Sequence, residues 1–255
     1  MAADTPNGMT PAQLDQHLSE ISTVWTVLFQ AHAGPADAAG AAQRQMLQRY
    51  SSAVYRYLLA AVRSPEVADD LFQEFALRLV RGDFKRADPE RGRFRDFLKT
   101  SLYHLIVDHG RRQQRRPLTL SPDHPEPAGE PPPEAASDRE FLAIWKSELM
   151  RRAWEALAQV ERQTGQILYT VLRARADHPE LRSPQMAEQL SRQLGKPVSA
   201  VWVRKRLFLA REKFTDLLLE EVARSLEQAT LEDLEQELAD LELLDYCRPA
   251  LERRR

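Results

Sequence analysis

A cluster of prolines in the middle of the chain limits the folds that it can adopt. Residues 117–138 hold seven of the sixteen prolines in the 255-residue chain, with Ser, Gly and Glu between them. Proline fixes its own backbone dihedral and lacks an amide donor, so no packed helix or central strand fits this composition. We predict an extended linker here, which divides the chain into two modules.

Before the linker, apolar residues recur at helical spacing. Thr10-Pro11 fits the start of a helix that runs on past Leu28 and is broken at Gly34-Pro35. A long helix is predicted over Ala36–Val62. Ser64-Pro65 reads as an N-cap followed by proline at the first helical position. The helix that it opens has an apolar stripe. This stripe is Val67, Leu71, Phe75 and Leu79.

The same periodicity continues on both sides of the linker. Arg81–Arg93 holds Gly82, Pro89 and Gly92 and is predicted to be a loop, after which a helix restarts at Phe94 and runs towards Arg116. Beyond the linker, helices are predicted over Phe141–Val160, Thr164–Ala176, Ser183–Leu194 and from Ser199 onward. No segment alternates with a period of two. The chain is therefore predicted to be all-α.

These patterns give five segments along the chain. An N-terminal extension with one helix covers 1–35, a first helical module covers 36–116, and the linker covers 117–138. A second helical module covers 139–224, and an acidic C-terminal extension covers 225–255. Short helix, glycine-containing turn and longer basic helix in the second module is the order of a helix-turn-helix.

The charges are sorted by segment, although the formal net charge is only −2. Residues 91–116 hold eight bases and two acids, and residues 196–213 hold six bases and one acid. Residues 66–74 hold four acids and no base, and residues 220–245 hold ten acids and one base. The near-zero sum therefore conceals two basic blocks of the kind that meet nucleic acid.

Catalytic and metal motifs are lacking in the sequence. The histidines show no pair at metal-ligand spacing beside a carboxylate except the weak Asp108-His109, and no phosphate-binding loop or nucleophile motif occurs. We expect no enzyme activity, no cofactor and no metal. The lone Cys247 excludes an internal disulfide. With no apolar run of about 20 residues and no secretory signal, the expected location is the cytoplasm, with no membrane contact.

Two basic segments have the composition of DNA-binding surfaces. If Val203 and Leu207 face the core of the longer basic helix, Lys205 lies on the opposite side, where it can contact phosphates and guanine edges. The block from Arg93 to Arg112 mixes aromatic rings with cations, which suits unstacked single-stranded DNA. The alternative for both is a solvated cationic face. The acidic helix around Asp70 is either a solvated face or a dock for a basic protein surface.

The order of these segments resembles bacterial extracytoplasmic-function sigma factors of RNA polymerase. Tyr50–Arg116 is similar to sigma region 2, through Ala68-Asp69-Asp70-Leu71-Phe72-Gln73-Glu74-Phe75, then Phe94-Arg95-Asp96-Phe97-Leu98, His104, and Asp108 with Arg111-Arg112. Residues 141–224 are similar to region 4, through Val203-Arg204-Lys205-Arg206-Leu207-Phe208-Leu209-Ala210-Arg211. The longer form resembles the subgroup common in planctomycetes.

The resemblance implies a role for each matching residue. The polymerase core would be bound through its β′ clamp helices and its β flap. The residues implied to contact the clamp helices are Asp69, Asp70, Leu71, Gln73 and Glu74. Those implied to recognise and open the −10 promoter element are Arg95, Lys99, Tyr103, His104, Arg111, Arg112 and Arg115. Those implied to read the −35 element are Ser199, Trp202, Arg204, Lys205 and Arg206.

The resulting hypothesis is a sigma factor without catalysis of its own, with an anti-sigma factor or kinase as a further possible partner. The alternatives are a helix-turn-helix regulator that acts without polymerase, and an acidic interaction protein. The tail over Glu220–Asp245 carries a leucine stripe. It is predicted either to fold over a basic block and inhibit it, or to extend the core of the second module.

Overall fold

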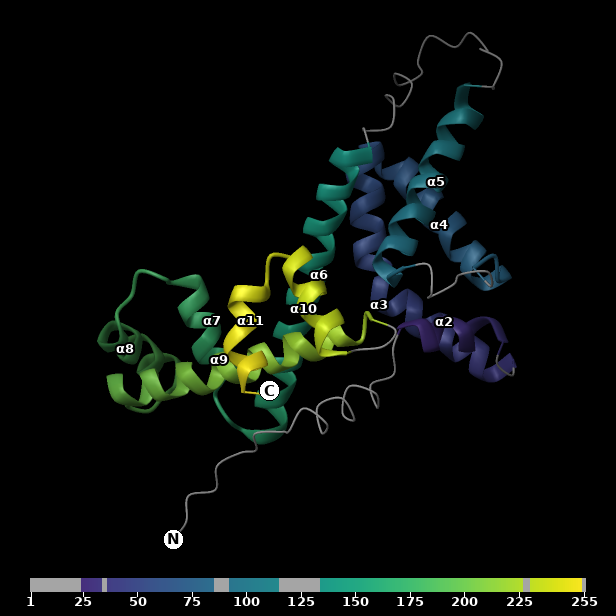
Figure 1. Ribbon diagram of the computed structural model, residues 1–255. Coiled ribbons are helices and arrows are strands. Elements are labelled where there is room, and N and C mark those ends of the chain that lie inside the picture. The colour runs from purple at the N-terminus through teal and green to yellow at the C-terminus, as the bar shows by residue number, and fades with distance from the viewer. Residues whose placement is uncertain (1–23, 34–35, 85–91, 115–133, 227–229, 254–255) are drawn as a thin grey trace, which may run out of the picture. The chain divides into compact units, whose positions relative to one another are not determined.

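A computed structural model of the chain describes residues 24–33, 36–84, 92–114, 134–226 and 230–253 (Figure 1). Within these ranges every regular element is a helix, which confirms the all-α prediction. The described residues form two compact units. The first unit extends to Glu148 and includes residues 223–233. The second unit holds Leu149–Val222 and the residues from Leu234 onward. The helix start predicted at Thr10-Pro11 lies outside the described residues.

The first unit begins with α2 (Val24–Ala33), α3 (Ala36–Val62) and α4 (Pro65–Arg81). The Ser64 hydroxyl accepts a hydrogen bond from the Val67 amide at 3.4 Å, and Pro65 occupies the first turn, so the predicted cap is confirmed. At the other end Gly82 has φ of 82°, a left-handed conformation that suits glycine and ends α4. The Leu71, Phe75 and Leu79 side chains of α4 are buried.

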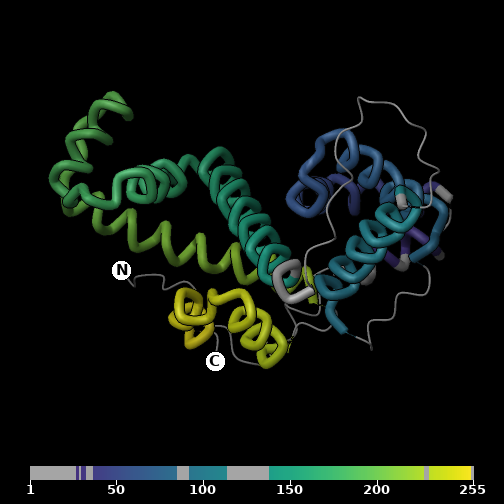
Figure 2. Tube along the Cα trace, turned by 90° about the horizontal axis from the view of Figure 1, so that it is seen from above, coloured from purple at the N-terminus to yellow at the C-terminus, as the bar shows by residue number. Residues whose placement is uncertain are grey.

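Helix α5 (Phe94–Gln114) packs with α3 and α4, and Figure 2 shows this bundle from above. Its start at Phe94 is the one predicted. The stripe that it buries continues at helical spacing along two-thirds of the helix. These buried residues are Phe94, Leu98, Leu102, Leu105 and Ile106. The apolar stripe therefore presses one side of α5 against its neighbours and leaves the other side accessible.

Helix α6 (Glu134–Thr164) begins earlier than predicted, so the last five residues assigned to the linker are helical. Its first half belongs to the first unit, where Trp145 stacks on Tyr50 of α3 at 5.4 Å and Phe141 meets Tyr57 at 5.2 Å. Arg56 donates to the Ile144 carbonyl at 3.1 Å. The sequence pattern assigns Phe141 and Trp145 to the second module, since periodicity identifies a buried face but not its partner.

The second unit contains the rest of α6 with α7 (Tyr169–Asp177), α8 (Ser183–Leu194) and most of α9 (Ala200–Ala223). Helix α7 starts five residues later than predicted. Gly165 has φ of 67°, a left-handed conformation that stops α6 and leaves Ile167 and Leu168 in the connection. The α8 bounds match the prediction. Trp154 of α6 packs on Phe214 of α9 with ring centroids 4.8 Å apart.

The acidic tail forms α10 (Leu231–Asp240) and α11 (Leu244–Glu252). Helix α11 lies against the second half of α9, where Tyr246 meets Phe214 and Arg253 pairs with Glu212 at 3.4 Å. Leu238, Cys247 and Leu251 are buried. These contacts favour the interpretation of the tail as an extension of the second unit's core.

Candidate functional site

One edge of α4 carries the acidic residues that the sequence singles out. Asp69, Asp70 and Gln73 are exposed, while Glu74 is half-buried and pairs with Arg78 at 2.9 Å. Leu71 is only 3% exposed, because it lies one turn before Phe75 on the buried stripe. Leu71 therefore supports the helix from within the unit, and its implied contact with a partner stays a prediction.

The acidic edge of α4 is held to α3 through a phenol. Tyr55 of α3 donates a hydrogen bond to Asp69, and this bond, together with desolvation and the charges of Asp69 and Glu66, raises the pKa of Tyr55 above its ordinary value of 10.0. The Tyr55 ring also meets Phe72 edge-on at 6.2 Å. Asp69 is therefore partly engaged within the unit, whereas Asp70 and Gln73 face solvent.

The same edge of α4 ends in two exposed apolar side chains that the sequence patterns did not identify. Leu77 is 47% exposed and Val80 is 54% exposed. Both continue the helical row of Asp70 and Gln73, at spacings of four and three residues. Their position opposite the buried Phe75 and Leu79 was the available signal. The row is acidic at its start and apolar at its end.

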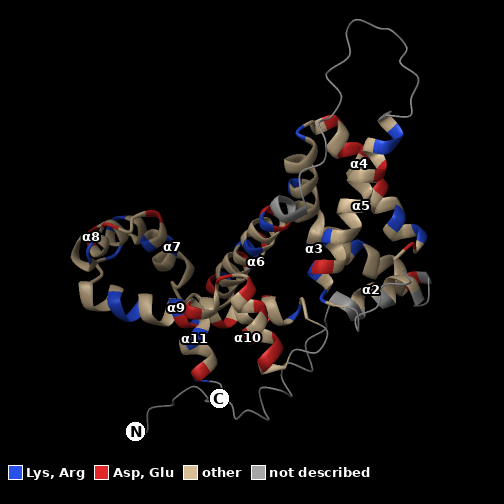
Figure 3. Ribbon diagram, turned by 45° about the horizontal axis from the view of Figure 1, so that its top comes forward, with Lys and Arg blue, Asp and Glu red and all other residues tan. Residues whose placement is uncertain are grey.

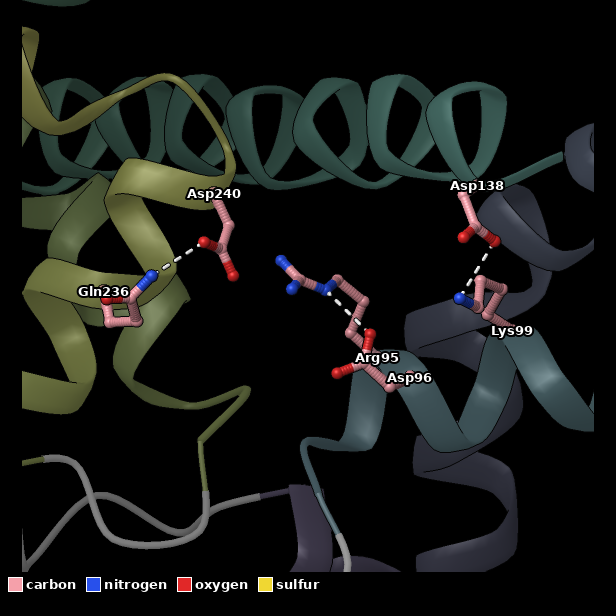
Figure 4. A network of polar contacts seen from close by, with 6 residues as sticks. All are labelled: Arg95, Asp96, Lys99, Asp138, Gln236 and Asp240. Carbon is pink, nitrogen blue, oxygen red and sulfur yellow. Dashed lines mark hydrogen bonds and ion pairs between the residues drawn. The ribbon is translucent and has the colours of Figure 1, made fainter. Parts of the chain in front are cut away.

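On α5 the predicted DNA-contacting residues fall into different environments. Arg95 is only 5% exposed and lies beside Asp96 at 3.5 Å, because it follows Phe94 on the inner face of the helix; its implied DNA contact stays a prediction. Lys99 pairs with Asp138 of α6 at 2.9 Å, as Figure 4 shows. Tyr103 is half-buried, and its ring lies 6.3 Å from that of the exposed His104.

The C-terminal end of α5 is cationic and accessible. Arg111 and Arg112 are exposed, and they follow His104 on the outer side of the helix. The predicted contact Arg115 lies outside the described residues. The described outer surface of α5 therefore combines a ring pair in the middle with cations at the end, which is the combination that binds single-stranded DNA.

Helices α8 and α9 form the predicted helix-turn-helix, and side-chain hydrogen bonds fix its turn. Gly195 has φ of 64° and ends α8. The Ser191 hydroxyl accepts from the Val198 amide at 2.9 Å and donates to the Ala187 carbonyl at 2.7 Å. The Ser199 hydroxyl accepts from the Trp202 amide at 3.1 Å, which caps α9. Ser199 therefore has a structural function, whatever else it contacts.

The outer face of α9 is basic along its first half, as the charge colouring in Figure 3 shows. Arg204 and Lys205 are exposed, and Val203 and Leu207 are buried as predicted. Arg206 is half-buried with its guanidinium 5.7 Å from the Trp202 ring centre, so these two side chains support each other. Arg204 and Lys205 are thus exposed cations of the kind that contact phosphates and base edges.

Other classes of site have little support in the described part of the chain. Among its residues no group of three or more His, Cys, Asp or Glu side chains could hold a metal ion. In the same part no helix is long and apolar enough to cross a membrane.

A comparison with protein families identifies the helices around α4 and α5. Residues 46–116 match the family described as Sigma-70 region 2. This stretch of the chain is similar to sigma-70 region 2. The match supports a sigma factor of the sigma-70 family, a class of initiation factors that bind RNA polymerase core and promoter DNA and are not enzymes. No curated protein and no solved structure matched the chain.

The residues that match sigma-70 region 2 cover three of the helices of the first unit. The match starts at Met46 within α3, includes all of α4 and α5, and ends at Arg116. The acidic edge of α4 and the cationic end of α5 therefore both lie within the residues that match sigma-70 region 2. The assignment of α6–α9 to sigma region 4 stays a prediction that rests on the helix-turn-helix and its basic face.

Proposed function

We propose that the chain is an extracytoplasmic-function sigma factor that directs RNA polymerase to specific promoters in the cytoplasm. The region 2 match over α3–α5 is the observation that carries the proposal. It is supported by an α8–α9 helix-turn-helix whose turn and cap are fixed by Ser191 and Ser199. In this proposal the first module recognises the −10 element and the second module recognises the −35 element.

In this proposal the exposed edge of α4 binds the β′ clamp helices of the polymerase core. Asp70 and Gln73 supply accessible polar groups. Glu74 can bind the clamp helices by giving up its ion pair with Arg78. Charge complementarity at such a surface speeds encounter and fixes the register of binding. Leu71 acts indirectly, since its burial keeps the helix in place.

The outer side of α5 then binds the −10 element and supports strand opening. Tyr103 and His104 offer rings on which unstacked bases can stack, and Arg111 and Arg112 offer charge to the backbone. Bases captured in this way shift the equilibrium toward the open duplex without nucleotide hydrolysis. The α9 face with Arg204 and Lys205 reads the −35 element in the major groove.

The deciding experiment reconstitutes the full chain with core polymerase. We expect run-off transcription from promoters recovered by sequencing the DNA that the holoenzyme captures. Asp70→Lys is expected to reduce capture of the core at least tenfold in a pull-down. Glu140→Lys, which makes the same charge change at an exposed position of α6 in the first unit, serves as the matched control.

Each outcome separates the proposal from its alternatives. Equal capture by wild type and Asp70→Lys, or no transcription from any captured DNA, contradicts the proposal. Selective duplex binding without polymerase would instead identify a stand-alone helix-turn-helix regulator.

A further inference from the structure

Two large apolar side chains project from the basic face of α9. Val201 is 64% exposed and Phe208 is 61% exposed, the highest values among the large hydrophobic residues that the structure describes as exposed. Their neighbours Val203 and Leu207 are buried in the core of the second unit, so the helix orientation places Val201 and Phe208 outside. Both side chains are therefore available for an apolar contact when the face is occupied.

Val201 and Phe208 share a helical row with a cation between them. Lys205 follows Val201 by four residues and precedes Phe208 by three, so the three lie along one line on the surface. At 1.5 Å per residue, Val201 and Phe208 are about 10 Å apart along the helix axis. Val201 sits in the first turn of α9, which the Ser199 cap holds. Recognition helices contact base edges with this N-terminal end.

The charges around this row select a polyanion as the occupant. From Gln189 to Arg211 the chain has six bases and no acid. A protein partner would favour a continuous apolar core depleted of charge, but here Arg204 and Lys205 separate the two apolar residues. The row therefore fits a DNA groove, where cations meet phosphates or guanines and apolar groups meet the few apolar atoms of the bases.

We propose that Val201 and Phe208 are specificity-determining residues that read thymine methyl groups in the major groove, on either side of a base that Lys205 contacts. The C5-methyl of thymine is the apolar group that the bases of unmodified DNA display in this groove, and a lysine there favours guanine O6 and N7. A separation of about 10 Å corresponds to about three steps of 3.4 Å along a strand. The inference rests on the proposed use of α9 as a duplex-reading helix, and it adds which bases are read.

Replacing thymine by uracil tests this proposal, because uracil lacks only the methyl group. Promoter duplexes are selected with the full chain and core polymerase, and each thymidine of the −35 region is then replaced singly by deoxyuridine. Binding is measured by competition at fixed salt. Burial of one methyl group corresponds to about a fourfold change in affinity. We expect two positions about three base pairs apart at which uracil weakens binding by that factor.

Substitutions on α9 assign each position to a side chain. Val201→Ala is expected to remove the thymine preference at one position, and Phe208→Ala at the other. Arg192→Ala, an exposed cation of α8, is the matched control: it should weaken all duplexes alike and keep both preferences. Because both apolar side chains are exposed, the variants should fold, which circular dichroism verifies.

The results distinguish this inference from the proposed function. If the holoenzyme transcribes from selected promoters but binds thymine and uracil duplexes equally, methyl reading is wrong and the sigma-factor proposal stands. Retention of both preferences by Val201→Ala and Phe208→Ala also overturns it. A chain that neither captures core polymerase nor selects any duplex contradicts the proposed function itself.

Discussion

Trp145 offers a quantitative test of how α6 is held in the first unit. Its ring is 1% exposed and stacks on Tyr50 with ring planes 4° apart, while Phe141 and Phe94 lie at 6.0 and 6.4 Å. Its indole N–H is buried and has no hydrogen-bond acceptor in the described part of the chain. A buried donor without an acceptor costs about 1–3 kcal/mol. Burial of the Trp145 ring therefore stabilises the unit, while burial of its N–H without an acceptor destabilises it.

The two terms give different expectations for two substitutions. Trp145→Ala removes the whole ring and should lower the free energy of unfolding of the first unit by about 3–5 kcal/mol. Trp145→Phe loses burial equivalent to about two methylene groups, roughly 1.6 kcal/mol, but also removes the N–H penalty of about 1–3 kcal/mol. The net effect of Trp145→Phe should therefore lie within about 1.5 kcal/mol of zero.

Urea denaturation followed by circular dichroism at 222 nm measures these differences. Leu157→Ala, at a fully buried position of α6 in the second unit, identifies the transition of that unit and serves as a control. A Trp145→Phe variant that is destabilised as much as Trp145→Ala would refute the reasoning. That result would mean that the indole shape or an acceptor for its N–H, rather than apolar burial, holds the helix.

Three further predictions concern a cap, a carboxylate and the tail. Ser199→Ala should destabilise the second unit by about 1 kcal/mol in thermal melting, because it removes the cap of α9. In a DNA titration it should weaken binding to every duplex by the same factor. An effect confined to one base sequence would contradict a capping role. Hydrogen bonds from its own backbone amide and from Ser64 lower the pKa of Glu66 below 4.5, so its stabilisation is complete above that pH and is lost as the pH falls through the lowered pKa. Glu66→Gln should therefore flatten the acid side of the stability profile, whereas an unchanged profile would contradict this. Deletion of residues 227–255 should lower the melting temperature of the second unit, because it exposes Phe214, and should leave duplex affinity no higher; a gain in affinity would instead support self-inhibition.

Local signals in the sequence determined the helices well where a cap or a break coincided with the apolar period. Ser64-Pro65 and Gly82 bound α4 at both ends, and α8 follows its predicted range from Ser183 to Leu194. At α7 the apolar Ile167 and Leu168 suggested a helix, but the left-handed Gly165 delayed its start. A backbone conformation of this kind is not visible in a hydrophobic pattern.

Tertiary partners were the part that the sequence could not supply. The apolar stripe with Phe141 and Trp145 predicts a buried face, yet its contact with Tyr50 and Tyr57 depends on packing between residues about 90 positions apart. The burial of Leu71 follows from the apolar stripe of its helix, whereas the burial of Arg95 depends on packing that the sequence pattern does not show. The exposed Leu77, Val80, Val201 and Phe208 could have been found, since each lies opposite a buried row on its own helix.

The pair between Lys99 and Asp138 affects how promoter binding should respond to salt. A lysine that neutralises a phosphate ordinarily displaces one condensed counterion, which steepens the dependence of affinity on salt by about one unit. Lys99 already has an anion of its own at 2.9 Å, so moving it onto DNA leaves Asp138 to attract a cation from solution. The gain in released ions is largely cancelled. The slope of affinity against salt concentration for binding to the −10 element should therefore indicate fewer phosphate contacts than the number of cations on α5.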